Sequence, residues 1–158
     1  YKRMLGLITE SHFVFQTLEE AHDLTIFLAN FFPEPERMVL GISELLINAV
    51  EHGNLGITYE EKTLLNKRGC WDEEIQRRLV LPAYARKRVR IHYEKRSDDI
   101  ILTISDEGRG FEWHRYLDMD PDRATDTHGR GIAMSCLMSF DAVRYEGSGN
   151  TVTCVVRC

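Results

Sequence analysis

The chain has 158 residues, of which 43% are hydrophobic, and a net charge of −5. This length and composition predict one globular domain, residues 1–158, with a substantial core. The chain has no apolar run near the roughly 18 residues that span a bilayer and no signal-peptide pattern, so we expect a soluble, cytoplasmic protein with no membrane contact. Because it begins with Tyr1, we expect it to be excised from a longer polypeptide. The four cysteines form no C-x-x-C pair, which favours reduced thiols.

The charges are divided between a basic and an acidic segment. Residues 62–96 contain eleven Lys or Arg against four Asp or Glu, whereas residues 112–128 contain five acids against two Arg. Basic runs can bind nucleic acid, but this one lacks regularly spaced aromatic residues and the whole chain is acidic. We therefore expect no direct nucleic-acid binding, and a solvated surface or a docking site for an acidic protein is favoured.

The first half of the chain predicts a strand followed by helices. Residues 12–16 form a short strand in this interpretation, and Thr17 caps a helix through about residue 32, with Glu20 completing a capping box. Two prolines end that helix, and a second helix is expected over residues 36–53. Residues 55–86 are predicted to be an insertion with one or two short helices.

The second half predicts a hairpin, a loop, a helix and two strands. Alternating apolar residues at 89–93 and 100–104 flank a turn, which is typical of an antiparallel hairpin. A polar loop follows, then a helix over about 131–140 and strands at 142–146 and 151–157. This order predicts an α/β (α+β) two-layer sandwich, with helices on one face of a mixed, mostly antiparallel sheet.

The second predicted helix has two different faces. Seven apolar residues form one arc at helical spacing: Met38, Val39, Ile42, Leu45, Leu46, Ala49 and Val50. The opposite arc carries Gly41, Glu44, Asn48, Glu51 and His52. A polar arc of this kind is usually a solvated surface, so other motifs must decide whether it is a metal and phosphate site.

Two glycine-containing motifs follow. Asp106-Glu107-Gly108-Arg109-Gly110 comes directly after a predicted strand, where an Asp can accept a hydrogen bond from an exocyclic amine and glycines let the backbone approach a flat ring. Gly129-Arg130-Gly131-Ile132 opens the predicted helix at 131, where free amides and the helix dipole favour an anion. Taken alone, the first is typical of a tight turn and the second of a hinge.

The three motifs together resemble the N, G1 and G2 boxes of the GHKL ATPases, which include gyrase, certain chaperones, sensor histidine kinases and mismatch-repair ATPases. The boxes are Glu44-x-x-x-Asn48 with His52-Gly53-Asn54, Asp106-x-Gly108-x-Gly110, and Gly129-x-Gly131. Within that superfamily the chain is most similar to the anti-sigma-factor serine/threonine kinases of bacterial partner-switching systems, in which the Glu-x-x-x-Asn helix continues into a His-Gly pair.

The resemblance implies a GHKL fold that binds ATP and Mg²⁺. In this interpretation Asn48 is the Mg²⁺ ligand, and Glu44 is the general base that accepts a proton from an incoming hydroxyl or orients a water. Asp106 holds the adenine. The remaining nucleotide contacts are expected from Asn48, His52, Gly108, Gly110, Gly129, Arg130, Gly131, Ile132 and Thr151, while Glu51 is expected to be structural. For His52, a solvated or helix-capping role is an equal alternative.

The resemblance also implies a protein serine/threonine kinase that acts on an anti-sigma-factor antagonist and regulates a sigma factor, with a homodimer as a further expectation. Two alternatives stay open: a sensor histidine kinase catalytic domain, and a non-catalytic nucleotide-dependent binding module. The insertion at 55–86 departs from a compact anti-sigma kinase. The acidic loop at 112–128 would repel a free triphosphate, so Mg²⁺ is expected to affect ATP affinity strongly.

Overall fold

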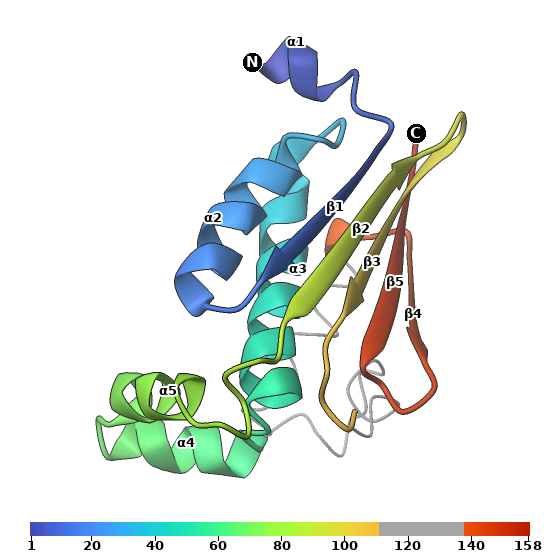
Figure 1. Cartoon of the computed structure of the whole chain (residues 1–158). Coiled ribbons are helices and arrows are strands. Elements are labelled where there is room, and N and C mark those ends of the chain that lie inside the picture. The colour runs from blue at the N-terminus through green and yellow to red at the C-terminus, as the bar shows by residue number, and fades with distance from the viewer. Residues whose placement is uncertain (111–137) are drawn as a thin grey trace.

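The computed structural model of this chain describes residues 1–110 and 138–158. These residues form a two-layer α/β sandwich, with α2 and α3 on one face of a five-stranded sheet (Figure 1). The elements in chain order are α1 (Lys2–Leu5), β1 (Glu10–Phe15), α2 (Leu18–Ala29), α3 (Pro35–Asn48), the π-helix η1 (Ala49–Asn54), α4 (Tyr59–Lys67), α5 (Trp71–Leu79), β2 (Val89–Lys95), β3 (Asp99–Ser105), β4 (Ala142–Glu146) and β5 (Thr151–Arg157).

The sheet has the order β1-β2-β3-β5-β4. All four strand pairs in the described residues are antiparallel, so the two-layer sandwich with a mostly antiparallel sheet is confirmed, and these residues include no parallel pair. The apolar residues that alternate along β2 and β3 in the sequence are the buried ones in the structure. Four of them are each at most 2% exposed: Ile91, Tyr93, Leu102 and Ile104. The strands at 142–146 and 151–157 are found at the predicted positions.

Local sequence signals determine where the first two long helices, α2 and α3, begin. Thr17 caps α2: its hydroxyl accepts from the Glu20 amide at 3.1 Å, and the Glu20 carboxylate accepts from the Thr17 amide at 3.1 Å, which is the predicted capping box. Pro35 begins α3, where proline's fixed φ suits the first helical turn. The short helix α1 was not predicted from the sequence.

The insertion predicted at 55–86 contains two helices, α4 and α5, which lie beside the end of α3 that continues into η1 (Figure 1). Arg78 on α5 holds them in place. Its guanidinium donates to the Leu55 carbonyl and to the carboxylates of Glu61 and Glu74, at 2.8 to 2.9 Å. The predicted helix at 131–140 falls almost entirely outside the described residues.

Candidate functional site

The helix with the predicted polar face changes form after Asn48. It was expected to run to Gly53, but the α-helix α3 ends at Asn48 and residues Ala49–Asn54 form the π-helix η1. There the Leu55 amide donates to the Val50 carbonyl, five residues earlier, at 2.9 Å. A π-turn holds an extra residue and is frequent at functional sites, because it shifts the phase of the side chains that follow.

The predicted division into apolar and polar arcs is wrong at three positions. Glu51 was placed on the polar arc, yet it is 2% exposed. Gly41 is buried against Ser139, whose hydroxyl accepts from the Gly41 amide at 2.9 Å. Gly41 therefore belongs to the packed interior and not to an open polar face. Val39, assigned to the apolar arc, is 41% exposed. A helical wheel drawn at 3.6 residues per turn does not predict a change of helix type, and it does not predict that a distant segment packs against a glycine.

Glu44 and Asn48 keep the spacing of one helical turn at the end of α3, and both are partly buried. Burial raises the pKa of the Glu44 carboxyl, and the positive charge of Lys62 partly opposes this. The buried Nδ2 of Asn48 has no hydrogen-bond partner among the described residues. A buried amide donor in this state costs free energy unless a ligand or water accepts from it.

Asp106 follows β3 and is packed against Gly53 of η1. A Cβ atom on Gly53 would lie 2.4 Å from the Asp106 Cγ, and one on Gly108 would lie 2.2 Å from the Gly53 oxygen. Both positions therefore require glycine. The Gly108 amide donates to Asp106 Oδ1 at 2.8 Å. Burial raises the pKa of Asp106 to about 6, although this hydrogen bond and the charge of Lys87 both lower it. Because a pKa of about 6 lies below neutral pH, the carboxylate can still accept hydrogen bonds there.

The turn between β4 and β5 closes over the same region. The Asp106 amide donates to the Asn150 carbonyl at 2.9 Å, and the Asn150 side chain donates to the Gly108 carbonyl at 3.3 Å. Gly110 has a φ of +86°, and a Cβ there would lie 1.9 Å from the Ser148 oxygen. The D-x-G-x-G motif thus bends at Glu107 and Gly108, packs against the β4–β5 turn, and contributes Asp106 and Gly110 to the wall of a cavity.

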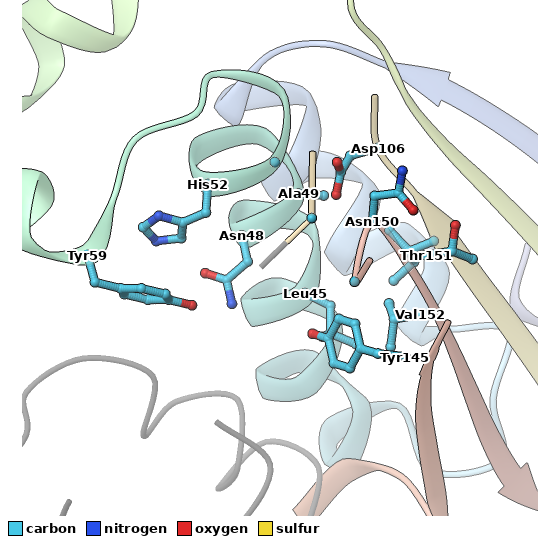
Figure 2. Close-up of a pocket in the computed structure, with 14 residues that line it drawn as sticks. Leu45, Asn48, Ala49, His52, Tyr59, Asp106, Tyr145, Asn150, Thr151 and Val152 are labelled. Carbon is cyan, nitrogen blue, oxygen red and sulfur yellow. The ribbon is translucent and has the colours of Figure 1, made fainter. Parts of the chain in front are cut away.

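That cavity lies between the α3–η1 helix and the ends of β3 and β5, with about 430 Å³ of empty space that is partly open to solvent (Figure 2). Of the predicted site residues it is lined by Asn48, His52, Asp106, Gly110 and Thr151. Its other lining residues, which sequence reasoning missed as contacts, are Leu45, Ala49, Gly53, Tyr59, Ile104, Tyr145, Gly149, Asn150 and Val152. Glu44 is not among the described residues that line it, and Gly108 lines a neighbouring hollow.

His52 and Tyr59 form one side of the cavity. Their rings stack with centroids 4.0 Å apart, and His52 Nδ1 is hydrogen-bonded to the Ile57 carbonyl. The His52 side chain is 9% exposed, so the alternative of a solvated histidine does not hold. In Figure 2 the hydroxyl end of Tyr59 points toward Asn48. Across the cavity, the Thr151 hydroxyl lies 3.3 Å from that of Ser105.

Behind the cavity, Glu51 is paired with Lys62 of α4. The Lys62 Nζ lies 2.6 Å from Glu51 Oε2 and 5.0 Å from the centre of the Trp71 ring. Burial still raises the pKa of Glu51, and the charge of Glu44 adds to this. The two carboxylates and Lys62 therefore form one electrostatic unit that joins the insertion to the predicted catalytic helix.

The predicted phosphate motif, Gly129, Arg130, Gly131 and Ile132, lies outside the described residues, as does the acidic loop at 112–128. These assignments stay predictions.

A family model of the histidine kinase-like ATPase domain matches residues 27–156, which includes every element from the end of α2 to β5. The chain belongs to this family. No individual curated protein matches the chain significantly. Membership makes this histidine kinase-like ATPase domain a nucleotide-binding domain of the kinase and ATPase type, in a superfamily whose members bind ATP with Mg²⁺. In the described residues of the domain, no helix has the length and apolar character needed to cross a membrane.

Proposed function

We propose that the domain is a protein serine/threonine kinase that transfers the γ-phosphoryl group of ATP to a hydroxyl of an anti-sigma-factor antagonist, and so regulates a sigma factor. The observation that carries the proposal is the pair at the end of α3. A half-buried Glu44 with a raised pKa precedes, by one helical turn, an Asn48 whose buried amide has no described partner.

Asp106 and its glycines fit the adenine end of ATP. A buried carboxylate is a strong acceptor for the exocyclic N6 amine, and Gly53, Gly108 and Gly110 leave the backbone close enough to cover a flat ring. The cavity is also lined by apolar side chains against which a flat ring can pack: Leu45, Ala49, Ile104 and Val152.

Asn48 fits the phosphate end. Its carbonyl oxygen is a suitable Mg²⁺ ligand, and its orphan Nδ2 can donate to a phosphate oxygen. Mg²⁺, when bound, neutralises the charge that develops on the β- and γ-phosphate oxygens. Asn48 therefore both binds and orients the group that is transferred.

Glu44 acts on the acceptor hydroxyl. The hydroxyl oxygen attacks the γ-phosphorus, the bond from that phosphorus to the β–γ bridging oxygen breaks, and ADP leaves, while the hydroxyl proton passes to the Glu44 carboxylate. Partial burial brings the pKa of Glu44 closer to neutral pH, which favours proton acceptance. The positive charge of Lys62 opposes this rise.

The test is to incubate the domain with Mg²⁺ and γ-labelled ATP together with candidate antagonist proteins, and to measure acid-stable phosphoserine or phosphothreonine. We expect Glu44→Gln to lower the transfer rate by about 10²-fold or more with little change in ATP affinity. Asn48→Ala should lower both. Glu36→Gln, an exposed glutamate in the first turn of the same helix, is the matched control and should leave both unchanged.

Wild-type transfer by Glu44→Gln would contradict the assignment of Glu44. Acid-labile phosphohistidine on a partner would instead favour a sensor histidine kinase, and tight ATP binding without transfer to any antagonist would favour a nucleotide-dependent binding module.

A further inference from the structure

The outer face of the sheet carries two histidines and a glutamate at the β1 edge. Helices α2 and α3 cover the other face (Figure 1), and alternate residues of β1 and β2 point away from them. Glu10 and His12 of β1 and His92 of β2 share this outer face, and His12 lies directly opposite His92 in the strand register. Glu10 and His12 therefore meet His92, which is eighty residues later in the sequence, across two strands.

Their donor atoms converge. His92 Nε2 lies 2.8 Å from Glu10 Oε1, His12 Nε2 lies 3.6 Å from the same oxygen, and one ligand atom from each residue lies within 4.8 Å of the other two. In a tetrahedral zinc site with bonds of about 2.0–2.1 Å, neighbouring ligand atoms are roughly 3.3 Å apart. The separations to Glu10 bracket that value, so small side-chain rotations bring the three atoms to ligand distance.

We propose that Glu10, His12 and His92 form a binding site for a zinc-class divalent metal ion on the outer face of β1 and β2. Two neutral imidazoles and a carboxylate are ligands that such ions prefer, whereas Mg²⁺ and Ca²⁺ select oxygen. Water completes the coordination, because the side chains are open to solvent: 68% exposed for His12, 58% for Glu10 and 36% for His92. The site is independent of the nucleotide cavity and of the proposed kinase activity.

The surroundings of the site are nearly balanced in charge. On the same face Arg90 precedes His92 by two residues and Glu94 follows it by two, while Glu94 also pairs with Arg96 at 3.4 Å. Without metal, the hydrogen bond with His92 lowers the pKa of Glu10. A metal bound to His92 Nε2 would take the place of that hydrogen bond.

A metal ion at this site would stabilise the pairing of β1, at the edge of the sheet, with β2. Among the residues that the structure describes, β1 pairs with β2 alone, and a metal held by both strands stabilises that pairing by binding only the folded state. The expected consequence is a melting temperature that depends on zinc.

The experiment is titration of the chain with ZnCl₂ in nucleotide-free buffer, by calorimetry and by thermal melting, with EDTA as the metal-free reference. Zinc at a hundredfold excess over its Kd should raise the Tm by about 5 °C or more. His12→Ala and His92→Ala should each weaken zinc binding by at least about tenfold and remove most of the Tm rise. His22→Ala, an exposed histidine on α2, is the matched control and should change neither.

The variants must melt as the parent does in EDTA, which separates loss of metal from loss of fold. If one variant unfolds, the imidazole NMR signals of His12 and His92 in the unmodified chain provide the second test, since both must shift on adding zinc. Zinc binding that is unchanged in both variants, signals that do not shift, or no binding at millimolar zinc would overturn the proposal.

Discussion

Gly53 and Asp106 are in van der Waals contact across the boundary between the helix layer and the sheet, with no room for a side chain between them. A Cβ on Gly53 would lie 2.4 Å from the Asp106 Cγ and 2.5 to 2.7 Å from its two oxygens. Gly53, in the π-helix that continues α3, and Asp106, which follows β3, therefore set one another's positions. Substitution at either should act on the cavity as well as on stability.

Gly53→Ala should displace Asp106 and impair both folding and nucleotide binding. The overpacking is expected to cost about 1–3 kcal/mol in the free energy of unfolding, and ATP affinity should fall at least tenfold because the carboxylate moves. Urea unfolding and calorimetric titration with Mg-ATP measure the two effects. Gly69→Ala is the control: its φ of +68° makes alanine strained, but a Cβ there contacts nothing within 4 Å. It should lower stability and leave affinity intact, and an equal affinity loss in both variants would contradict the prediction.

The position of Gly53 illustrates what the sequence could reveal. The His52-Gly53 pair was noted as part of a family motif, yet only the structure shows that the glycine is required by a side chain more than fifty residues later. The π-helix between Asn48 and Leu55 has no signature in hydrophobic periodicity, which is why Glu51 was assigned to the wrong face. By contrast, the strands and the capping box depend on neighbours in sequence and were predicted well.

Replacing Asp106 by asparagine should stabilise the nucleotide-free domain at neutral pH. The folded-state pKa of Asp106 is raised to about 6 from an ordinary 3.8, so the folded protein holds this proton more tightly than the unfolded chain does. The stability that protonated Asp106 contributes is fully present below pH 3.8 and is lost as the pH rises through about 6.

Urea unfolding without nucleotide, at several pH values from about 4 to 7, measures this effect. The difference in stability between Asp106→Asn and the parent should grow in favour of the variant over that window. Asp98→Asn, at an exposed position in the β2–β3 turn, is the control and should show no such trend. A variant that is less stable than the parent at pH 7 would mean that the ionised carboxylate is held by favourable contacts rather than strained by burial.

Lys62→Met should destabilise the domain because it leaves Glu51 buried without its 2.6 Å partner. Breaking a fully buried pair costs about 3–5 kcal/mol, and the 31% exposure of the Lys62 side chain reduces the expected loss to about 1–3 kcal/mol. The double variant Lys62→Met/Glu51→Gln should recover much of it. Lys67→Met, at an exposed position on the same helix, serves as the control in thermal unfolding. If the double variant lost as much stability as the sum of the losses of the two single variants, Lys62 and Glu51 would not be coupled.

Loss of Lys62 should also alter the pH dependence of phosphoryl transfer. The charge of Lys62 lowers the pKa of Glu44 against the effect of burial, so its removal should move the acid limb of the rate profile to higher pH. In the proposed mechanism the rate requires ionised Glu44, and therefore at a pH on that limb the variant should be slower than the parent. An unchanged limb would show that Glu44 is not the group that titrates.

The cavity shows a second limit of the sequence-based interpretation. Asp106 and Gly110 could be predicted as its walls because they belong to a motif that follows a strand, and Thr151 because the family resemblance implied a nucleotide contact there. Tyr59, Tyr145 and Asn150 could not, since single aromatic or polar residues outside a motif have many possible roles. Asn150 lies between β4 and β5, and its side chain and carbonyl both form hydrogen bonds with the Asp106–Gly110 segment.

The most direct test of the nucleotide site compares the affinities of Mg-ATP and Mg-GTP by calorimetry, for the parent chain and for Asp106→Asn. If the Asp106 carboxylate accepts from the adenine N6 amine, the parent should prefer ATP by about 10²-fold or more, because the guanine carbonyl would face an acceptor. Asp106→Asn, which can donate as well as accept, should lose most of that preference. Equal binding of ATP and GTP by the parent, or a preference for ATP that survives in Asp106→Asn, would contradict the placement of adenine against Asp106.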